Sequence, residues 1–255
     1  MNPTPLGLRP LELGGGRVWV DKGLRLELAA GRRGYADAQV DDTSGRSRSD
    51  LRWRPPLQLE LRARSSSPEP KGTLGFGFWN DPFAVGLGAE GSRRRLPAPP
   101  QALWFFYGSP PNDMALAGMT GPGWRAASLR SPAWPAAVFL PAGAIAWAIS
   151  WLPLLRQPLL SLGARAISAA EAPLAVGLDD WHSYRLTWRG DRADFWVDEA
   201  HVLTAPSPPA GPLGFVAWID NQYAVASFDA PIRFGVLETA GAQMLEIERL
   251  AIERL

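Results

Sequence analysis

The sequence contains no cysteine and only two histidines among its 255 residues. Without cysteine there is no disulfide framework, thiol nucleophile or thiolate metal site. The absence of cysteine is compatible with an oxidising or a reducing compartment. Two histidines are too few for a three-histidine metal site. A Ser-His-Asp set would need His182 or His201, and no Gly-x-Ser-x-Gly motif supplies its serine. We therefore predict structural or solvent-exposed roles for both histidines.

The chain also lacks a strong charge imbalance, because its formal net charge is +1. Nucleic-acid binding needs a surface that neutralises phosphates, so no nucleic-acid partner is expected, and Arg93-Arg94-Arg95 is interpreted as a solvated loop. Residues 1–16 contain no apolar h-region, so we expect no signal peptide and a cytoplasmic location. Gly75-x-Gly77 lacks the third glycine and the following helix of a dinucleotide-binding loop. The oligomeric state stays open.

Glycine, proline and tryptophan are abundant, with 26, 25 and 12 residues respectively. Many turn-forming residues combined with many large rings favour a β-sandwich that carries an aromatic-lined surface. The length suits one large all-β domain, which we place at residues 1–255. We predict two antiparallel sheets of jelly-roll type.

Residues 181–198 give the clearest local pattern. Tyr184, Leu186 and Trp188 alternate with polar residues, Gly190-Asp191 interrupts the pattern, and Ala193, Phe195 and Val197 alternate again. Two runs of period two around a Gly-Asp break predict a β-hairpin with one buried face. Alternation or apolar runs predict further strands at residues 24–28, 34–40, 57–62, 124–130, 213–220, 223–228 and 245–248.

Two stretches predict strands with large rings. In 73–80, Leu74, Phe76 and Phe78 share one face, while Gly75, Gly77 and Trp79 share the other. Glycines beside a tryptophan leave the backbone bare, so either a ligand or a neighbouring strand approaches closely there. The continuous apolar run 102–107 predicts a strand that is covered on both sides or lines a cleft.

Residues 131–155 contain no charged residue. The stretch is long enough to span a bilayer, but Pro132, Pro135, Pro141 and Pro153 interrupt it, and strands are predicted on both sides. We therefore predict an apolar insertion at 131–170, helical from about 142 to 170, that packs on the protein's own core. Arg156, Arg165 and the leucines of 159–162 keep a membrane-surface role for 131–162 open.

The chain resembles the concanavalin A-like lectin and glucanase superfamily, and most closely the laminarinase-type family 16 glycoside hydrolases. The hairpin 181–198 is similar to the family's penultimate hairpin, Gly72–Trp79 to the strand before its catalytic strand, and Leu245–Leu250 to its closing strand. The resemblance implies a sandwich with a ligand site on its concave sheet, and it does not specify an activity.

One departure from the family is decisive for catalysis. The family's catalytic strand carries Glu-x-Asp-x-x-Glu, whose carboxylates act as nucleophile and acid/base about 5 Å apart. The corresponding run here, Ala102-Leu103-Trp104-Phe105-Phe106-Tyr107, contains no carboxylate, and the motif occurs nowhere else. If this mapping holds, the retaining chemistry is absent.

The remaining candidates are aromatic and polar residues of these strands. Rings stack on the apolar faces of sugars, while amides and carboxylates bind hydroxyl groups. The predicted ligand-binding residues are Trp79, Asn80, Trp104, Tyr107, Trp218, Asp220 and Asn221. The alternative is that these tryptophans belong to the core. Asp41-Asp42 and Asp179-Asp180 could help to hold calcium, although solvated turn carboxylates are the simpler interpretation, and no cofactor is otherwise expected.

These observations leave three classes of function. The first is a non-catalytic binding module that holds a glycan or another small, partly apolar ligand on an aromatic-lined concave sheet. The second is a divergent glycoside hydrolase that uses Asp81, Asp113 or Asp220 as catalytic carboxylates. The third is a membrane-surface protein that uses residues 131–162.

Overall fold

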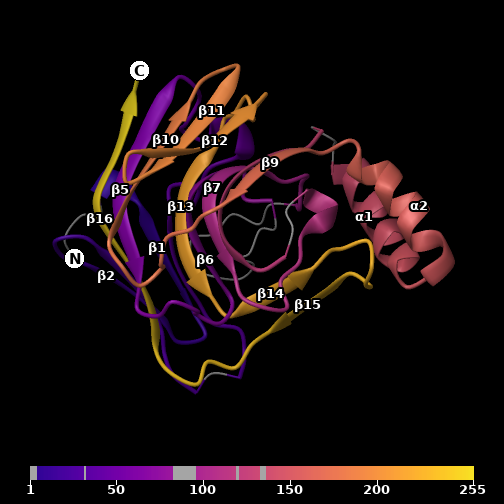
Figure 1. The fold of residues 1–255 in the computed structure, drawn as a ribbon, viewed down its shortest axis with the longest axis horizontal. Helices are drawn as coiled ribbons and strands as arrows, with labels where there is room; N and C mark the ends of the chain where they lie inside the picture. Colours follow the sequence, from indigo (N-terminus) through magenta and orange to yellow (C-terminus); the bar gives the residue numbers. More distant parts are fainter. Residues whose placement is uncertain (1–4, 32, 83–95, 119–120, 133–135) are drawn as a thin grey trace.

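The computed structural model describes residues 5–31, 33–82, 96–118, 121–132 and 136–255. Within this part, two antiparallel sheets of seven strands face each other as a β-sandwich of jelly-roll type, as the sequence predicted (Figure 1). Arg93-Arg94-Arg95 lies outside the described residues.

Sheet A contains most of the predicted site residues. From edge to edge its strands are β1 (Arg9–Leu13), β4 (Asp37–Asp41), β13 (Gly214–Asp220), β6 (Thr73–Trp79), β7 (Gln101–Gly108), β8 (Gly123–Arg130) and β9 (Ser168–Pro173). It corresponds to the predicted concave sheet, because it holds the strands expected near 73–80, 102–107 and 213–220.

Sheet B contains the hairpin that the sequence predicted most clearly. From edge to edge its strands are β12 (Ala200–Pro206), β11 (Arg192–Val197), β10 (His182–Trp188), β5 (Leu57–Ser65), β16 (Gln243–Arg254), β3 (Leu24–Leu28) and β2 (Gly16–Val20). Tyr184 pairs with Val197 and Trp188 with Ala193, so the hairpin forms in the register expected from the alternation.

The main core lies between the two sheets. Alternate residues of facing strands fill it, including Phe76 and Phe78 from β6, Phe105 from β7, and Leu186 and Trp188 from β10. Trp188 is fully buried, and its indole N–H donates to the carbonyl of Pro209 at 3.0 Å. This core therefore accounts for the period-two pattern of the sequence.

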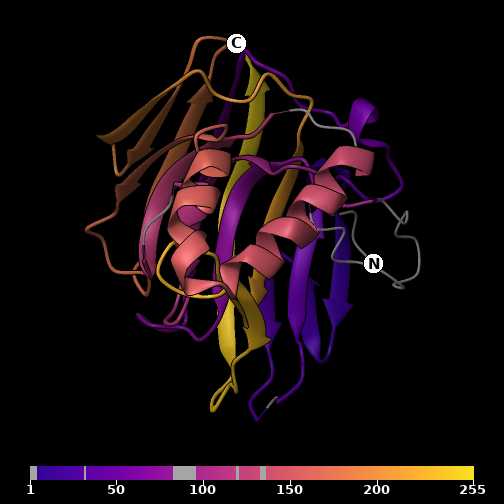
Figure 2. The same cartoon turned by 90° about the vertical axis from the view of Figure 1, so that its right-hand side faces the viewer.

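The apolar insertion forms two helices, α1 (Ala136–Ser150) and α2 (Pro153–Ala164), beside the outer face of sheet A (Figure 2). The hairpin β14 (Gln222–Val225) and β15 (Arg233–Val236) extends to them. The predicted helical insertion is confirmed, but the helices occupy residues 136–164 instead of about 142–170, so both ends lie about six residues earlier in the chain. Pro141 and Pro158 lie inside helices, and Ser168–Pro173 pairs with β8, because the open edge of the sheet outweighs local preference.

The expectation that the insertion packs on the protein's own core was wrong for most of its large side chains. Leu160 is buried, but Trp147, Trp151 and Leu154 are exposed. Two short helices beside a sheet can direct only their inner sides toward it. No described helix is long and apolar enough to cross a membrane.

Candidate functional site

Three of the predicted tryptophans lie together on the outer face of sheet A. Trp218, Trp79 and Trp104 come from the adjacent strands β13, β6 and β7. The rings of Trp79 and Trp218 are parallel within 4° with centroids 6.1 Å apart, and those of Trp104 and Trp218 are 5.6 Å apart. Phe106 stacks on Trp104 at 5.5 Å. We call these four residues the ring cluster.

Gly75 provides the space that the ring cluster needs. It lies opposite Trp218 in the β6–β13 register. A Cβ atom at this position would lie 2.8 Å from Cη2 of the Trp218 indole and 2.4 Å from the carbonyl oxygen of Phe105. The close approach that the glycines predicted is therefore made by a tryptophan of the neighbouring strand.

The ring cluster is closed. Trp79, Trp104 and Trp218 are only 5–7% exposed, and Met114, Ala117 and Ile167 pack against them. The indole N–H of Trp218 donates to the Thr73 hydroxyl at 2.9 Å. In the described part of the chain, those of Trp79 and Trp104 have no hydrogen-bond partner. The cluster is thus a second apolar core under the segment 113–118.

The structure separates Tyr107, Asn80 and Asn221 from this cluster. Tyr107 lies in the main core, because it occupies the opposite face of β7 from Trp104. The side chain of Asn80 is buried between the carbonyl of Pro99 and the N–H of Gln101. Its contacts hold the ends of a loop, so its amide is already occupied.

Asn221 has a similar structural role at the end of β13. Its side chain is fully buried. The carboxamide oxygen accepts from the N–H of Ala36 at 2.8 Å, and the nitrogen donates to the carbonyls of Gly34 and Leu237. It therefore joins three chain segments through their backbones.

Asp220 shares the outer face of sheet A with Trp218 and lies opposite Asp37 in the neighbouring strand β4. Its carboxylate accepts from the hydroxyl of Thr73 at 2.8 Å and from the N–H of Gln222. Burial raises the pKa of Asp220 to about 7. Burial and the neighbouring charge of Asp220 raise the pKa of Asp37 well above its usual range.

Asp81 does not join this pair. Asp81 follows β6 at its Trp79 end, whereas Asp220 pairs with Thr73 at the other end, so the two backbones are about 20 Å or more apart. That separation is far beyond the roughly 5–10 Å of a glycosidase pair. The carboxylate of Asp113 accepts from the N–H of Ala115 in its own turn.

The histidines and Asp41 make local contacts, whereas the carboxylate of Asp42 accepts from the indole N–H of Trp53 at 2.6 Å and from the N–H of Phe215 at 2.8 Å. His182 bonds Asp198 at the start of the β10–β11 hairpin, and His201 bonds Thr204. Asp41 accepts from the backbone and hydroxyl groups of residues 43 and 44. Among the described residues, no three His, Asp or Glu side chains are placed to hold a metal ion.

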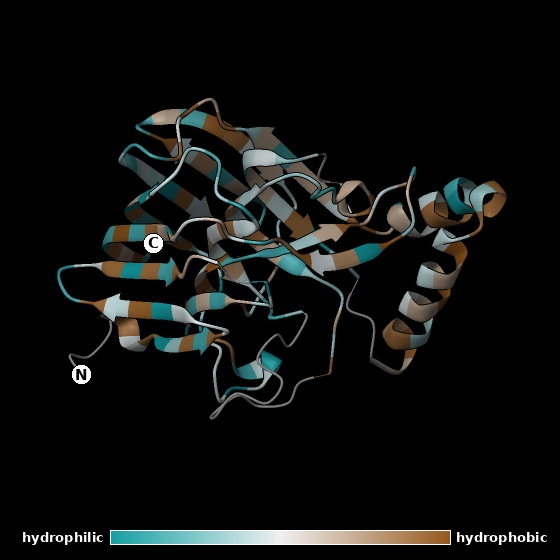
Figure 3. Cartoon of the chain, turned by 90° about the horizontal axis from the view of Figure 1, so that it is seen from below, coloured by the Kyte–Doolittle hydropathy of each residue, from teal (hydrophilic) through white to brown (hydrophobic). Residues whose placement is uncertain are grey.

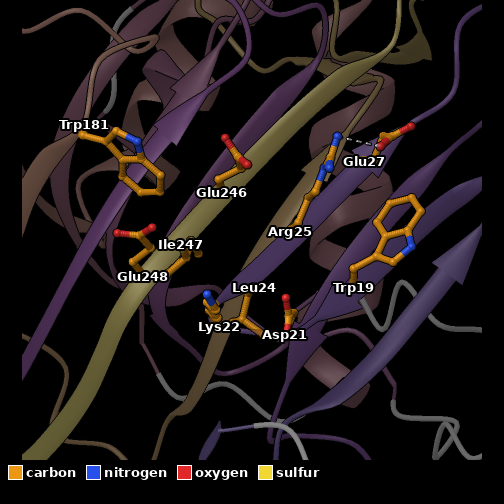
Figure 4. Close-up of a pocket in the computed structure, with 11 residues that line it drawn as sticks. Trp19, Asp21, Lys22, Leu24, Arg25, Glu27, Trp181, Glu246, Ile247 and Glu248 are labelled. Carbon is orange, nitrogen blue, oxygen red and sulfur yellow. Dashed lines mark ion pairs between the residues drawn. The ribbon is translucent and has the colours of Figure 1, made fainter. Parts of the chain in front are cut away.

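An open groove lies on the outer face of sheet B, where the sequence predicted no site (Figure 4). Its volume is about 550 Å³. Trp19 of β2 borders one side and is 45% exposed, and Trp181 borders the other. Between these rings lie charged side chains of β3, β16 and the turn between β2 and β3, namely Asp21, Lys22, Arg25, Glu27, Glu246 and Glu248. We call this feature the groove.

Arginines lie on both sides of the groove, and on the Trp19 side the guanidinium of Arg25 is 5.7 Å from the centre of the Trp19 ring. Arg64 contacts Glu246 at 2.7 Å, and Arg62 contacts Glu248 at 3.5 Å. The guanidinium groups of both arginines lie 5.0–5.3 Å from the centre of the Trp181 ring. Such pairs fix the carboxylate orientations and leave other oxygen lone pairs available for a ligand. The groove thus combines two flat rings with hydrogen-bond donors and acceptors.

The sequence contained a signal for the groove. Leu24, Leu26 and Leu28 predicted β3 correctly, but the intervening Arg25 and Glu27 were not considered as site residues. The pairing of β16 with β3 and β5 brings Glu246 and Glu248 beside them. This pairing joins β3 to a strand near the other end of the chain, so local periodicity does not reveal it.

No known protein family and no curated protein matches the sequence. Among solved structures, the chain is similar to a legume lectin-like domain from Entamoeba histolytica, with 10% identity, 97% of this chain and 90% of that one covered, and a TM-score of 0.49. A family 16 glycoside hydrolase from Bacteroides ovatus gives 13% identity, 94% and 86% coverage, and 0.48.

A carbohydrate-binding module from Bacillus subtilis covers 99% of this chain and 97% of its own, at 10% identity and a TM-score of 0.40. The chain itself has the two facing antiparallel sheets that the sequence resemblance implied. At these identities the similarity concerns the fold alone, and ligand and activity have to be argued from the side chains.

Proposed function

We propose that this protein is a non-catalytic carbohydrate-binding protein whose ligand lies in the groove on sheet B. The observation that carries the proposal is the pair Trp19 and Trp181 on either side of an open, charge-lined depression. Indole faces stack on the C–H faces of pyranose rings, and carboxylates and guanidinium groups bind sugar hydroxyls. The ligand site is therefore placed in the groove and not at Trp79, Trp104 and Trp218, which the sequence predicted as ligand residues but which are buried in the ring cluster.

The dimensions of the groove suit a short oligosaccharide. Trp19 lies on β2, while Arg62 and Arg64, which contact the Trp181 ring, lie on β5. Three strand spacings separate β2 from β5, which is about 14 Å. A ligand with several hydroxyl groups spans this distance and meets both rings.

The test is binding to a glycan array, followed by calorimetry with the glycans that bind. Trp19→Ala and Trp181→Ala should each weaken binding at least fivefold, because every lost ring contact removes about 1–3 kcal/mol of favourable apolar burial. Trp196→Ala is the matched control, since Trp196 stacks with Arg185 at 4.5 Å on the same sheet but does not line the groove. Equal affinity of all three variants would refute the groove.

A hydrolase is the second candidate, and one observation favours it. Asp220 and Asp37 are neighbouring carboxyl groups beside the ring cluster, and a carboxyl whose pKa is near 7 is suited to donate a proton. Both carboxyl groups are buried, so substrate would reach them only after the residues that cover them move. Turnover of aryl glycosides or β-glucans that Asp220→Asn abolishes would support this candidate.

A further inference from the structure

The helical hairpin α1–α2 presents an unusual amount of apolar surface to solvent. Of the fifteen large apolar side chains that are clearly exposed in the described residues, ten belong to this hairpin. They are Val138, Leu140, Ile145, Trp147, Trp151, Leu152, Leu154, Leu155, Leu159 and Leu162. Leu154 is 92% exposed. A concentration of this kind marks an interaction site rather than ordinary surface.

Specific contacts hold the hairpin in place, so the exposed side is a defined surface. The hydroxyl of Ser150 accepts from the N–H of Ile232 at 3.0 Å, and Arg156 donates to the carbonyl of Asp229 at 2.8 Å. Leu160 is buried on the inner side. The helices lie side by side in front of sheet A, and no other described helix or strand covers their outer sides (Figures 2 and 3).

The charges of the hairpin have one sign. Between residues 131 and 170 the sequence contains Arg156 and Arg165 but no aspartate or glutamate. Arg233 and the exposed Phe234 of β15 extend the same character beside it. Asp229 is the nearby acid, and its carboxylate accepts from Gln157 at 3.1 Å. An apolar surface with a cationic border is complementary to anionic lipid headgroups above an acyl layer.

Two other arrangements fit less well. In a symmetric dimer through this surface, the arginines of both copies would approach each other, and the segment has no acidic residue to offset their repulsion. A transmembrane arrangement is too short, because helices of 15 and 12 residues are about 22 and 18 Å long, against a hydrocarbon core of about 30 Å. A position within the membrane interface satisfies both constraints.

We infer that the α1–α2 hairpin docks this protein on the surface of a bilayer that contains anionic lipids. Trp147 and Trp151, whose rings are 6.2 Å apart, enter the headgroup region together with Leu154. Indole rings favour this region because one part is apolar and the other donates a hydrogen bond.

The test is flotation of the intact protein with vesicles of phosphatidylcholine and phosphatidylglycerol (about 7:3), and with phosphatidylcholine alone. The protein should float with both, and the bound fraction should be several-fold larger on anionic vesicles. Leu154→Asp should reduce the bound fraction at least fivefold. Leu255→Asp is the matched control, because Leu255 is 57% exposed at the C-terminus, away from the hairpin, and its binding should equal that of the wild type.

A second variant, Arg165→Gln, should lower binding to anionic vesicles and leave binding to neutral ones unchanged. Circular dichroism confirms that each variant is folded. Failure of the intact protein to float with either vesicle would overturn the inference. A second outcome would also overturn it. If the intact protein does not bind vesicles, has twice the mass of one chain in light scattering, and becomes a single chain in Leu154→Asp, then a second copy occupies the surface.

Discussion

Asp220 lies directly opposite Asp37 in the neighbouring strands β13 and β4, and both carboxyl groups are buried on the outer face of sheet A. Two carboxylates at adjacent positions of a sheet repel each other, and burial removes the water that would screen them. The fold therefore favours the protonated form of the pair, which links its stability to pH.

We predict that stability falls as pH rises from about 5 to 7. Burial raises the pKa of Asp220 to about 7, so the folded protein keeps a proton that the unfolded chain releases near pH 4. Because the folded state holds one more proton than the unfolded chain, the free energy of unfolding falls by up to about 1.4 kcal/mol for each unit by which the pH rises in this window. The wild type should lose about 2 kcal/mol more between pH 5 and 8 than Asp220→Asn, whose amide oxygen still accepts from Thr73.

Urea denaturation at about pH 5, 6, 7 and 8 measures this difference. Asp191→Asn, a change at an exposed turn carboxylate, controls for altered net charge. Parallel stability profiles of the wild type and Asp220→Asn would contradict the prediction.

Replacement of Trp218 by alanine should destabilise the fold rather than only remove a ligand contact. Trp218 packs on Trp79, Trp104 and Phe106 and is 7% exposed. Loss of a buried tryptophan costs about 3–5 kcal/mol. Trp151→Ala, at a ring that is 52% exposed, should cost less than about 1 kcal/mol. Thermal unfolding compares them, and equal melting temperatures would show that the ring cluster is not a core.

A methyl group at position 75 should be poorly tolerated. In Gly75→Ala the new Cβ would meet the carbonyl oxygen of Phe105 and the ring of Trp218, and the backbone of β7 cannot move away cheaply. We expect a loss of about 1–3 kcal/mol, as for other overpacked sites. Gly190→Ala is the control, because a Cβ atom added there would have no neighbouring atom within 4 Å. Denaturant unfolding of the two variants should differ clearly, and matching midpoints would contradict the close packing.

Asn221 should be required for stability although it lies beside the predicted ligand residues. Asn221→Ala leaves the N–H of Ala36 and the carbonyls of Gly34 and Leu237 without their partner. Each unsatisfied buried group costs about 1–3 kcal/mol, so the variant should unfold at a markedly lower urea concentration. Wild-type stability with weakened glycan binding would instead make Asn221 a ligand residue.

The fold could be predicted from the sequence because each strand carries its own signal. Leu74, Phe76 and Phe78 alternate with residues of the other face, and this period of two survives without knowledge of the neighbouring strands. The edge strands β1, β2 and β9 were missed, since one or both of their faces meet solvent and their alternation is weak. Ser168–Pro173 was assigned in part to a helix for this reason.

The site was harder to predict, because a site depends on what covers each face. The alternation correctly placed Trp79 and Trp218 on one side of their strands, but it could not show that Met114 and Ala117 close over them. Conversely, Trp19 and Trp181 lie far apart in the sequence, and only the order of strands in sheet B brings them to the same groove.

The two sheets separate the groove from the α1–α2 hairpin. The groove opens on the outer face of sheet B, and the hairpin lies beyond the outer face of sheet A, so the full thickness of the sandwich stands between them (Figure 1). Occupation of one surface leaves the other accessible. A molecule held at a bilayer by its helices would therefore direct Trp19 and Trp181 away from the lipid, toward the aqueous phase on the opposite side.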